Sequence, residues 1–105
     1  MTRIAAPTGE QFLLRHDGAH GTVEAVVTEV AAALRVLTVD GHALVQSFPR
    51  ESTPPFGHGI VLVPWPNRVR DGRWMHREKA LQLDITEVER GNAIHGLLRN
   101  TPYRV

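Results

Sequence analysis

The chain has 105 residues, 42% of them hydrophobic, and carries 12 basic and 11 acidic side chains for a net charge of +1. This length fits one small domain, the balanced charge gives no electrostatic reason to expect nucleic acid or an anionic membrane as a partner, and the absence of cysteine excludes disulfides and thiolate metal sites. No apolar run approaches the roughly 20 residues of a membrane span, so a cytoplasmic protein is expected.

The chain is predicted to begin with a loose lead-in and a short strand. Residues 1–9 contain a proline and a glycine and form the predicted lead-in, and residues 11–15 form a strand with Phe12 and Leu14 on one face. Residues 16–21 include two histidines four positions apart, a spacing that can mark a metal site. Two glycines disfavour a helix there and no second carboxylate lies close in sequence, so a solvated turn is predicted instead.

Residues 22–37 carry two conflicting signals. Their apolar side chains recur at helical spacing, and the alanines at 31–33 favour a helix. The valines and threonines of the segment favour a strand, and Val23, Ala25 and Val27 alternate as strand residues do. Periodicity taken by itself predicts a helix.

The middle of the chain is predicted to contain short strands and a loop. Residues 37–39 and 43–46 flank an Asp-Gly pair, which is typical of a two-residue hairpin turn. Residues 48–58 hold three prolines and are predicted to be a loop. Residues 60–63 predict a short buried strand.

The stretch from residue 62 to residue 74 contains two prolines, two tryptophans and three arginines. The prolines fix their own φ and bias the preceding residues toward extended backbone, so a stiff loop displays the Arg68 guanidinium beside Trp65. Asp71-Gly72 then predicts a second hairpin turn. A rigid loop that presents arginine and tryptophan is typical of a binding site, and a proline-rich connector with core tryptophans is the alternative.

The last third is predicted to hold one more hairpin and a charged turn. Residues 73–75 pair with residues 79–86, residues 87–91 form the turn, and residues 101–105 begin a further strand. The second strand of the hairpin places three apolar side chains toward the core: Leu81, Leu83 and Ile85. Short strands at regular spacing with repeated turn signals predict an all-β protein.

Two motifs resemble the N-terminal part of the aldose 1-epimerase (galactose mutarotase) family. They are Pro-Trp-Pro-Asn-Arg-Val-Arg-Asp-Gly at residues 64–72 and Asn-Ala-Ile-His-Gly-Leu at residues 92–97, and the resemblance begins near Phe12. It implies an antiparallel β-sandwich, the galactose mutarotase-like supersandwich, of which residues 1–105 are an incomplete N-terminal part.

The resemblance also bears on the ambiguous segment at residues 22–37. It implies two strands joined near Ala31-Ala32, where the family commonly has a Gly-Ala pair. We adopt this expectation in place of the helix.

Three site residues follow from the resemblance. Arg68 matches an arginine that contacts substrate hydroxyls in the family, and a guanidinium suits that task because it offers five N–H donors and stays charged. His95 matches the first of the family's two active-site histidines, which positions the sugar, and is the expected catalytic residue of this chain. Asn67 joins the expected substrate-binding set, mainly by holding the loop, and Gly96 lets a ligand or another backbone approach. By residue type alone, Arg68 also fits a surface arginine and His95 a core histidine. We expect the Arg68 and His95 side chains to open into one cleft.

The activity that the resemblance implies is the interconversion of the α and β anomers of an aldohexose. This reaction needs a base at the anomeric hydroxyl and an acid at the ring oxygen. The family's second histidine and its glutamate match no residue here, so the 105-residue chain alone is expected to be inactive. The expected partner is a small aldose sugar, with no cofactor, metal, nucleic acid or membrane, and with self-association through exposed sheet edges.

Three alternatives remain open. The first is a non-catalytic carbohydrate-binding module that kept Arg68 and His95. The second is a hexose-phosphate epimerase in which Arg70, Arg73 and Arg99 bind a phosphate. The third is a small β domain without a ligand.

Overall fold

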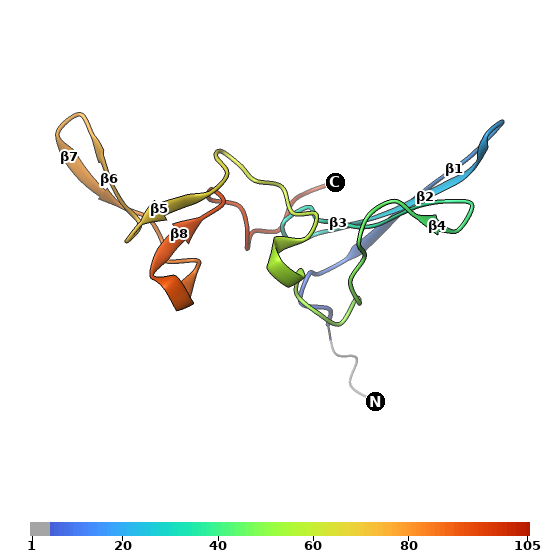
Figure 1. The fold of residues 1–105 in the computed structure, drawn as a ribbon, viewed down its shortest axis with the longest axis horizontal. Coiled ribbons are helices and arrows are strands. Elements are labelled where there is room, and N and C mark those ends of the chain that lie inside the picture. Colours follow the sequence, from blue (N-terminus) through green and yellow to red (C-terminus); the bar gives the residue numbers. More distant parts are fainter. Residues whose placement is uncertain (1–4) are drawn as a thin grey trace. The chain divides into compact units, whose positions relative to one another are not determined.

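A computed structural model describes residues 5–105 of the chain (Figure 1). These residues form eight strands and two 3₁₀ turns, with no α-helix among them. All named strands pair antiparallel, so the predicted all-β, antiparallel fold class is confirmed. This strand content fits a fragment of a β-sandwich. No helix of the described part of the chain could cross a membrane. Of the predicted lead-in, residues 1–4 lie outside the described residues.

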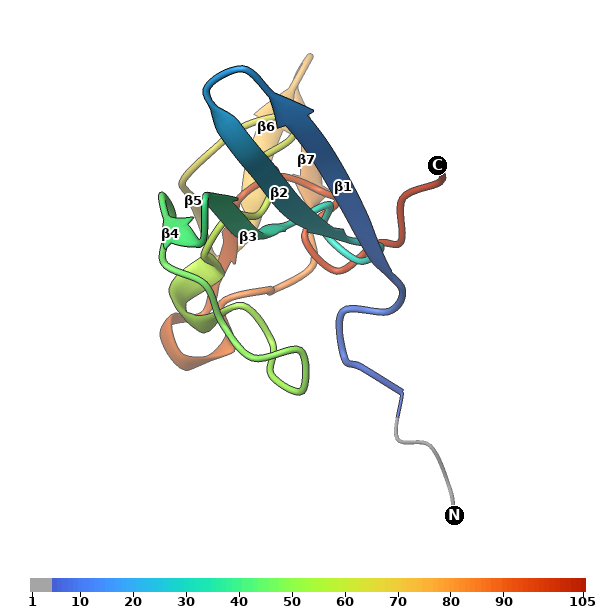
Figure 2. The same ribbon diagram turned by 90° about the vertical axis from the view of Figure 1, so that its right-hand side faces the viewer.

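Contacts divide the described residues into two units. The first consists of residues 5–61 and 100–105, and the second of residues 62–99. The first unit holds the strands β1 (Gln11–Gly18), β2 (Gly21–Thr28), β3 (Leu34–Val39) and β4 (His42–Ala43). They form one sheet in chain order, in which β1, β2 and β3 lie side by side (Figure 2).

β1 extends three residues beyond the strand predicted at 11–15. Its register with β2 runs to Gly18 opposite Gly21, so the turn predicted over residues 16–21 shrinks to two residues. Cross-strand bonds explain the extra length: Arg15 pairs with Glu24 at 3.1 Å, and the Thr22 hydroxyl donates to Asp17 at 2.6 Å. Such pairs stabilise neighbouring strands up to the hairpin end.

The helix that periodicity predicts over residues 22–37 is wrong, and the two strands implied by the family resemblance are confirmed. β2 and β3 are joined by a tight connection in which Ala31 and Ala32 have positive φ values of 66° and 46°. The Thr28 hydroxyl closes this connection, accepting from the Ala33 N–H at 3.0 Å and donating to the Val30 carbonyl at 2.7 Å. Tertiary pairing of the valines therefore prevails over the local preference of the alanines for a helix.

The Asp-Gly hairpin between β3 and β4 is confirmed, since Val39 pairs with His42 across Asp40 and Gly41. The second strand is shorter than the predicted 43–46. The prolines that follow lie in a loop, as predicted, and the loop contains the 3₁₀ turn η1 (Pro55–Gly57).

Two predicted strands do not form. Within residues 60–63 only Val63 makes a bridge, to Gly96, because Pro64 follows directly and has no N–H to continue a ladder. Val61 and Leu62 are about two-fifths exposed, so the segment is not buried. Within residues 101–105 a single bridge joins Pro102 to Val30, and here too a proline cannot donate to a ladder.

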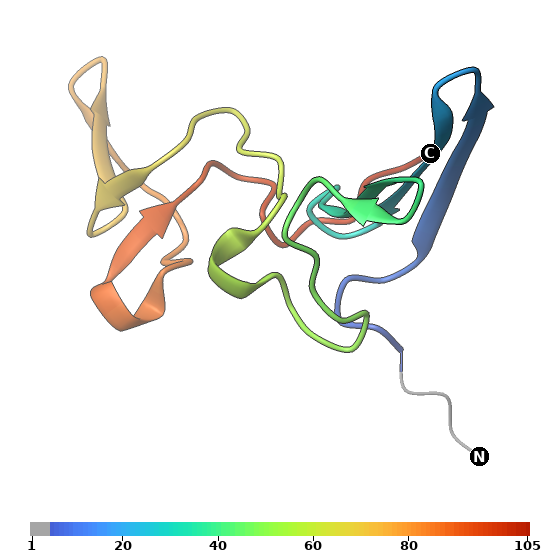
Figure 3. The ribbon, with the colours of Figure 1, turned by 45° about the vertical axis from the view of Figure 1, so that its right-hand side comes forward.

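The second unit contains two strand pairs, which Figure 3 shows as separate ribbons. β5 (Arg68–Arg70) pairs with β8 (Asn92–Ile94), and β6 (Arg73–His76) pairs with β7 (Lys79–Gln82). The 3₁₀ turn η2 (Val88–Arg90) precedes β8.

Three predictions for this unit need correction. Part of the predicted loop, Arg68–Arg70, is the strand β5. The tight turn at Asp71-Gly72 forms, but the hairpin is wrong, because β5 and β6 each pair with another strand. The β6–β7 hairpin is confirmed with a shorter second strand, yet Leu81 and Ile85 are 39% and 38% exposed and do not face a core. The buried apolar residues of this unit are Ala93 and Ile94.

Candidate functional site

Asn67, Arg68 and His95 meet at one end of the β5–β8 ribbon. Arg68 pairs directly with Ile94, so the residue before β5 lies beside the residue after β8. The Asn67 backbone N–H donates to His95 Nδ1 at 3.0 Å, and the His95 N–H donates to the Asn67 carbonyl at 2.9 Å. The structure thus brings the three sequence-predicted residues together within the second unit.

Left-handed backbone at Asn67 and His95 makes this pair of hydrogen bonds possible. The φ values of Asn67 and His95 are 70° and 59°. Asparagine tolerates this region because its short side chain bonds locally, and here Asn67 Oδ1 accepts from the Arg68 N–H at 2.9 Å. Asn67 therefore shapes the loop that leads into β5.

The imidazole of His95 is held in one tautomer. Because Nδ1 accepts a hydrogen bond, the ring proton of the neutral form resides on Nε2. Burial lowers the pKa of His95, and the positive charges of Arg99 and Arg68 lower it further, while Glu87 acts in the opposite direction. His95 is therefore a neutral N–H donor at pH 7.

The Arg68 guanidinium is held by Glu87, a residue that the sequence predicts only as part of a charged turn. Arg68 Nε donates to the two carboxylate oxygens at 2.8 and 3.1 Å, and Nη2 donates to Oε2 at 2.8 Å. The hydrogen bond from Arg68 is the main cause that lowers the pKa of Glu87 to about 2. No local motif could have revealed this partner, because the β5–β8 register and the bridge between Glu87 and Asn92 bring it to Arg68 from 19 positions away.

Gly96 serves a backbone contact. It has a φ of 76°, and a Cβ added there would collide with the Val63 carbonyl, with which this segment forms a bridge. The sequence left two roles open for Gly96, close approach of a ligand and close approach of another backbone. The structure shows the second. This contact fixes the residue that directly follows His95.

The tryptophans lie around a separate, apolar pocket. It has a volume of about 290 Å³ and is lined by Trp65, Val69, Trp74 and Leu83. Adjacent strand residues point to opposite faces, so the pocket on the side of Val69 lies across β5 from Arg68. The structure therefore does not support the expected display of the Arg68 guanidinium beside Trp65.

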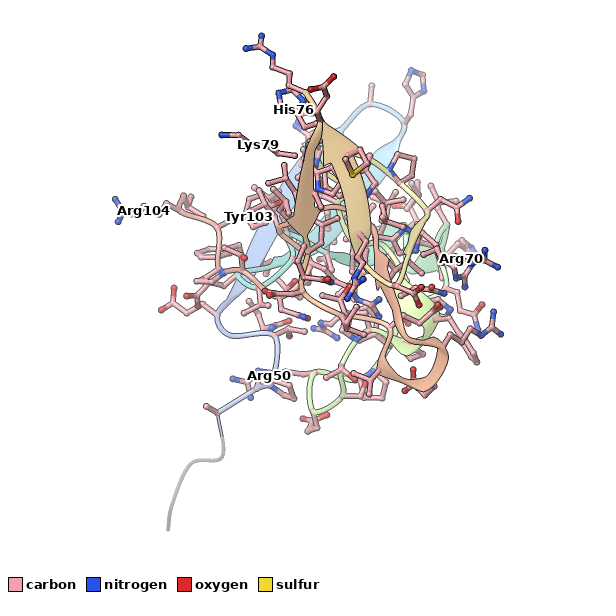
Figure 4. The ribbon with its side chains drawn as sticks, turned by 90° about the vertical axis from the view of Figure 1, so that its left-hand side faces the viewer. Arg50, Arg70, His76, Lys79, Tyr103 and Arg104 are labelled. Atoms are coloured by element: carbon pink, nitrogen blue, oxygen red, sulfur yellow. The ribbon has the colours of Figure 1, made fainter. Side chains whose placement is uncertain are left out.

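The other arginine of β5, Arg70, has no carboxylate partner of the kind that Glu87 provides for Arg68 among the described residues. Arg70 shares the face of Arg68, is exposed and extends outward (Figure 4). Among residues 5–105, no group of three or more histidine or acidic side chains could hold a metal ion.

Comparison with known proteins places the chain in a family. Residues 14–105 match the aldose 1-epimerase family, and the chain belongs to it. The chain is also similar to Uncharacterized protein YihR of Escherichia coli (strain K12), with 40% identity over 80 residues. That alignment covers 76% of this chain and 26% of the relative, so the chain spans about a quarter of the relative's length. The family resemblance drawn from the two motifs is confirmed.

Proposed function

We propose that this chain is the N-terminal, substrate-positioning part of an aldose 1-epimerase β-sandwich domain that interconverts the α and β anomers of an aldohexose. The observation that carries the proposal is the junction of Asn67, Arg68 and His95, which come from two distant motifs and are joined by hydrogen bonds. Family membership supports the class of activity.

In this proposal Arg68 and His95 bind the sugar as fixed donors. His95 Nε2–H donates to one substrate oxygen, because its other nitrogen is occupied by Asn67. Arg68 donates to hydroxyls through the N–H groups that Glu87 leaves free. Asn67 contributes by holding both neighbours in place, which reduces the entropy that the site loses on binding.

The reaction needs more groups than these. An acid at the ring oxygen and a base at the anomeric hydroxyl must act together, and each contributes about 10²–10⁴-fold to the rate. His95 is held as a neutral Nε2–H donor with Nδ1 occupied, so it can donate a hydrogen bond to a substrate oxygen but has no free nitrogen to act as the base. Arg68 remains protonated and cannot be the base either. The chain by itself should therefore bind an aldose without catalysing its mutarotation.

Binding and polarimetry test the proposal together. Galactose and glucose are titrated against the wild-type chain, Arg68→Ala and Arg15→Ala, the last being a matched ion-paired strand arginine of the first unit. Arg68→Ala should weaken binding by about tenfold or more, the value of a hydrogen bond from a charged donor, and Arg15→Ala should not.

Polarimetry on freshly dissolved α-galactose separates positioning from catalysis. The wild-type chain should leave the spontaneous rate almost unchanged. Acceleration that His95→Ala abolishes would show that the site is complete and that the assigned roles are wrong. Equal binding by all three proteins, or none, would contradict the proposed sugar site.

A further inference from the structure

We propose that Glu87 is the positioning residue of the sugar site, which fixes the Arg68 guanidinium and cancels its charge so that the site selects neutral hydroxyls over anionic groups. The inference rests on the proposed function, since it concerns how Arg68 meets a sugar. It adds a residue and a substrate preference that neither motif contains.

The geometry leaves a defined set of donors. A guanidinium has five N–H bonds, and the Glu87 carboxylate takes the one on Nε and one on Nη2. Three remain, both on Nη1 and the outer one on Nη2, and no side chain among residues 5–105 accepts from Nη1. A paired guanidinium loses little freedom when these donors meet a ligand, because its plane is already fixed.

Glu87 is itself held firmly. Its N–H donates to the Asn92 carbonyl at 2.9 Å, and the Asn92 N–H donates back to the Glu87 carbonyl at 3.2 Å. The Asn92 side-chain amide donates to Glu87 Oε1 at 3.2 Å. Only 12% of the Glu87 side chain is exposed, against 42% of Arg68, so the carboxylate is the sheltered half of the pair.

The charge of Glu87 decides which ligand fits. A phosphate brought to the free edge of Arg68 would lie close to a carboxylate, and like charges at such separation repel each other. A sugar hydroxyl accepts a hydrogen bond and carries no charge, so it incurs no such repulsion. This argues against the hexose-phosphate alternative at Arg68 itself.

The experiment compares Glu87→Gln and Glu87→Asp with a matched control, Glu89→Gln. Glu89 lies two positions away within η2, the 3₁₀ turn that begins directly after Glu87. It is exposed and makes no side-chain hydrogen bond or ion pair among the described residues. Each protein is titrated with galactose and with inorganic phosphate. Glu87→Gln should weaken galactose binding by about tenfold and strengthen phosphate binding, because it removes the charge-assisted pair. Glu87→Asp keeps the charge but shortens the reach, so it should weaken galactose binding only.

Two further readouts separate positioning from a general structural effect. In an Arg68→Lys background, Glu87→Gln should cause no additional loss of galactose binding, because Glu87 acts through the guanidinium. The ¹⁵N–¹H signal of Arg68 Nε should be sharp in the wild type and in Glu89→Gln, and should shift and broaden in Glu87→Gln.

The outcomes distinguish the two proposals. If Arg68→Ala loses galactose binding while Glu87→Gln matches Glu89→Gln for both ligands, the role of Glu87 is refuted and the sugar site stands. If no protein binds galactose, the proposed function fails. In that case the Arg68 Nε signal and the phosphate titration still test the role of Glu87. If Glu87→Gln changes neither the signal nor phosphate binding, that role is refuted.

Discussion

Two reciprocal hydrogen bonds between Asn67 and His95 determine what the imidazole can offer to a ligand. With Nδ1 accepting from the Asn67 N–H, only Nε2 is free, and it carries the proton. Protonation of the ring would place an N–H on Nδ1 opposite the Asn67 N–H, so two donors would face each other. The bond that orients His95 therefore requires the neutral form.

The pH dependence of binding follows from this requirement. Burial and the charges of Arg99 and Arg68 lower the folded-state pKa of His95 below 6.5, so the unfolded chain takes up the proton first as the pH falls. The stability that neutral His95 contributes is therefore full above pH 6.5 and is lost as the pH falls through the folded-state pKa. Affinity for galactose should be constant from about pH 8 to about pH 7 and decrease below that pKa.

Histidine ¹⁵N–¹H correlation spectra check this prediction at the atom concerned. At neutral pH the His95 ring should show the Nε2–H tautomer, with the exposed ring of His42 as an internal reference. An Nδ1–H tautomer, or tighter galactose binding in acid, would disprove this orientation of the ring.

At the scale of elements, the β5–β8 ribbon is a short platform that depends on one close backbone contact. Three residue pairs hold the two strands together, and the bridge between Val63 and Gly96 continues the ordered segment beyond His95. The absence of a side chain at Gly96 is what permits this contact. The position of His95 thus depends on its neighbour.

Gly96→Ala should be more damaging than an equivalent change at Gly91. Both glycines have positive φ, 76° and 66°, but a Cβ at Gly91 meets nothing within 4 Å. Gly91→Ala therefore incurs only the left-handed backbone term of about 1 kcal/mol in the free energy of unfolding. Gly96→Ala should cost about 1–3 kcal/mol more, because the Val63 backbone must move.

Urea denaturation of both variants, together with galactose titration, measures the two effects. Gly96→Ala should also lose galactose affinity, while Gly91→Ala should keep it. Equal losses of stability would show that strain at positive φ, and not the contact with Val63, explains the glycine.

The whole molecule consists of two units that differ in how their sheets are supported. The first unit has a four-stranded sheet with buried Ala31, Ala33 and Phe48, whereas the second has two separate two-stranded pairs. A two-stranded pair is at best marginally stable by itself in water. The expected self-association through exposed sheet edges stays a prediction.

Native-state hydrogen exchange should reveal this difference. Amides of β6 and β7 should exchange at lower opening free energies than those of β2, which is the inner strand between β1 and β3. Without galactose, the amides of β5 and β8 should have opening free energies between those of β6 and β7 and those of β2. Adding galactose should increase their protection. Equal protection across both units would show one cooperative unit and would contradict this prediction.

Much of the local structure and the family could be predicted from sequence because the signals are short-range. The Asp-Gly turns at residues 40–41 and 71–72 form because those residues tolerate positive φ wherever they occur. The two motifs predict that Asn67, Arg68 and His95 belong to one family site, and the family match confirms the resemblance itself. Short strands at regular spacing with repeated turn signals predict an all-β chain, although at residues 22–37 the family resemblance is needed to replace the helix that periodicity predicts.

Only the tertiary structure decided which strands pair and which groups meet. The turn at 71–72 formed without its hairpin, since β5 pairs with β8 and β6 with β7. The segment at 22–37 forms the two strands that the family resemblance implies, and not the helix that periodicity predicts, because valines of β2 and β3 gain cross-strand contacts. Glu87 reached Arg68 in the same way, through a register between distant segments, because contacts of this kind depend on the folded backbone and not on neighbours in sequence.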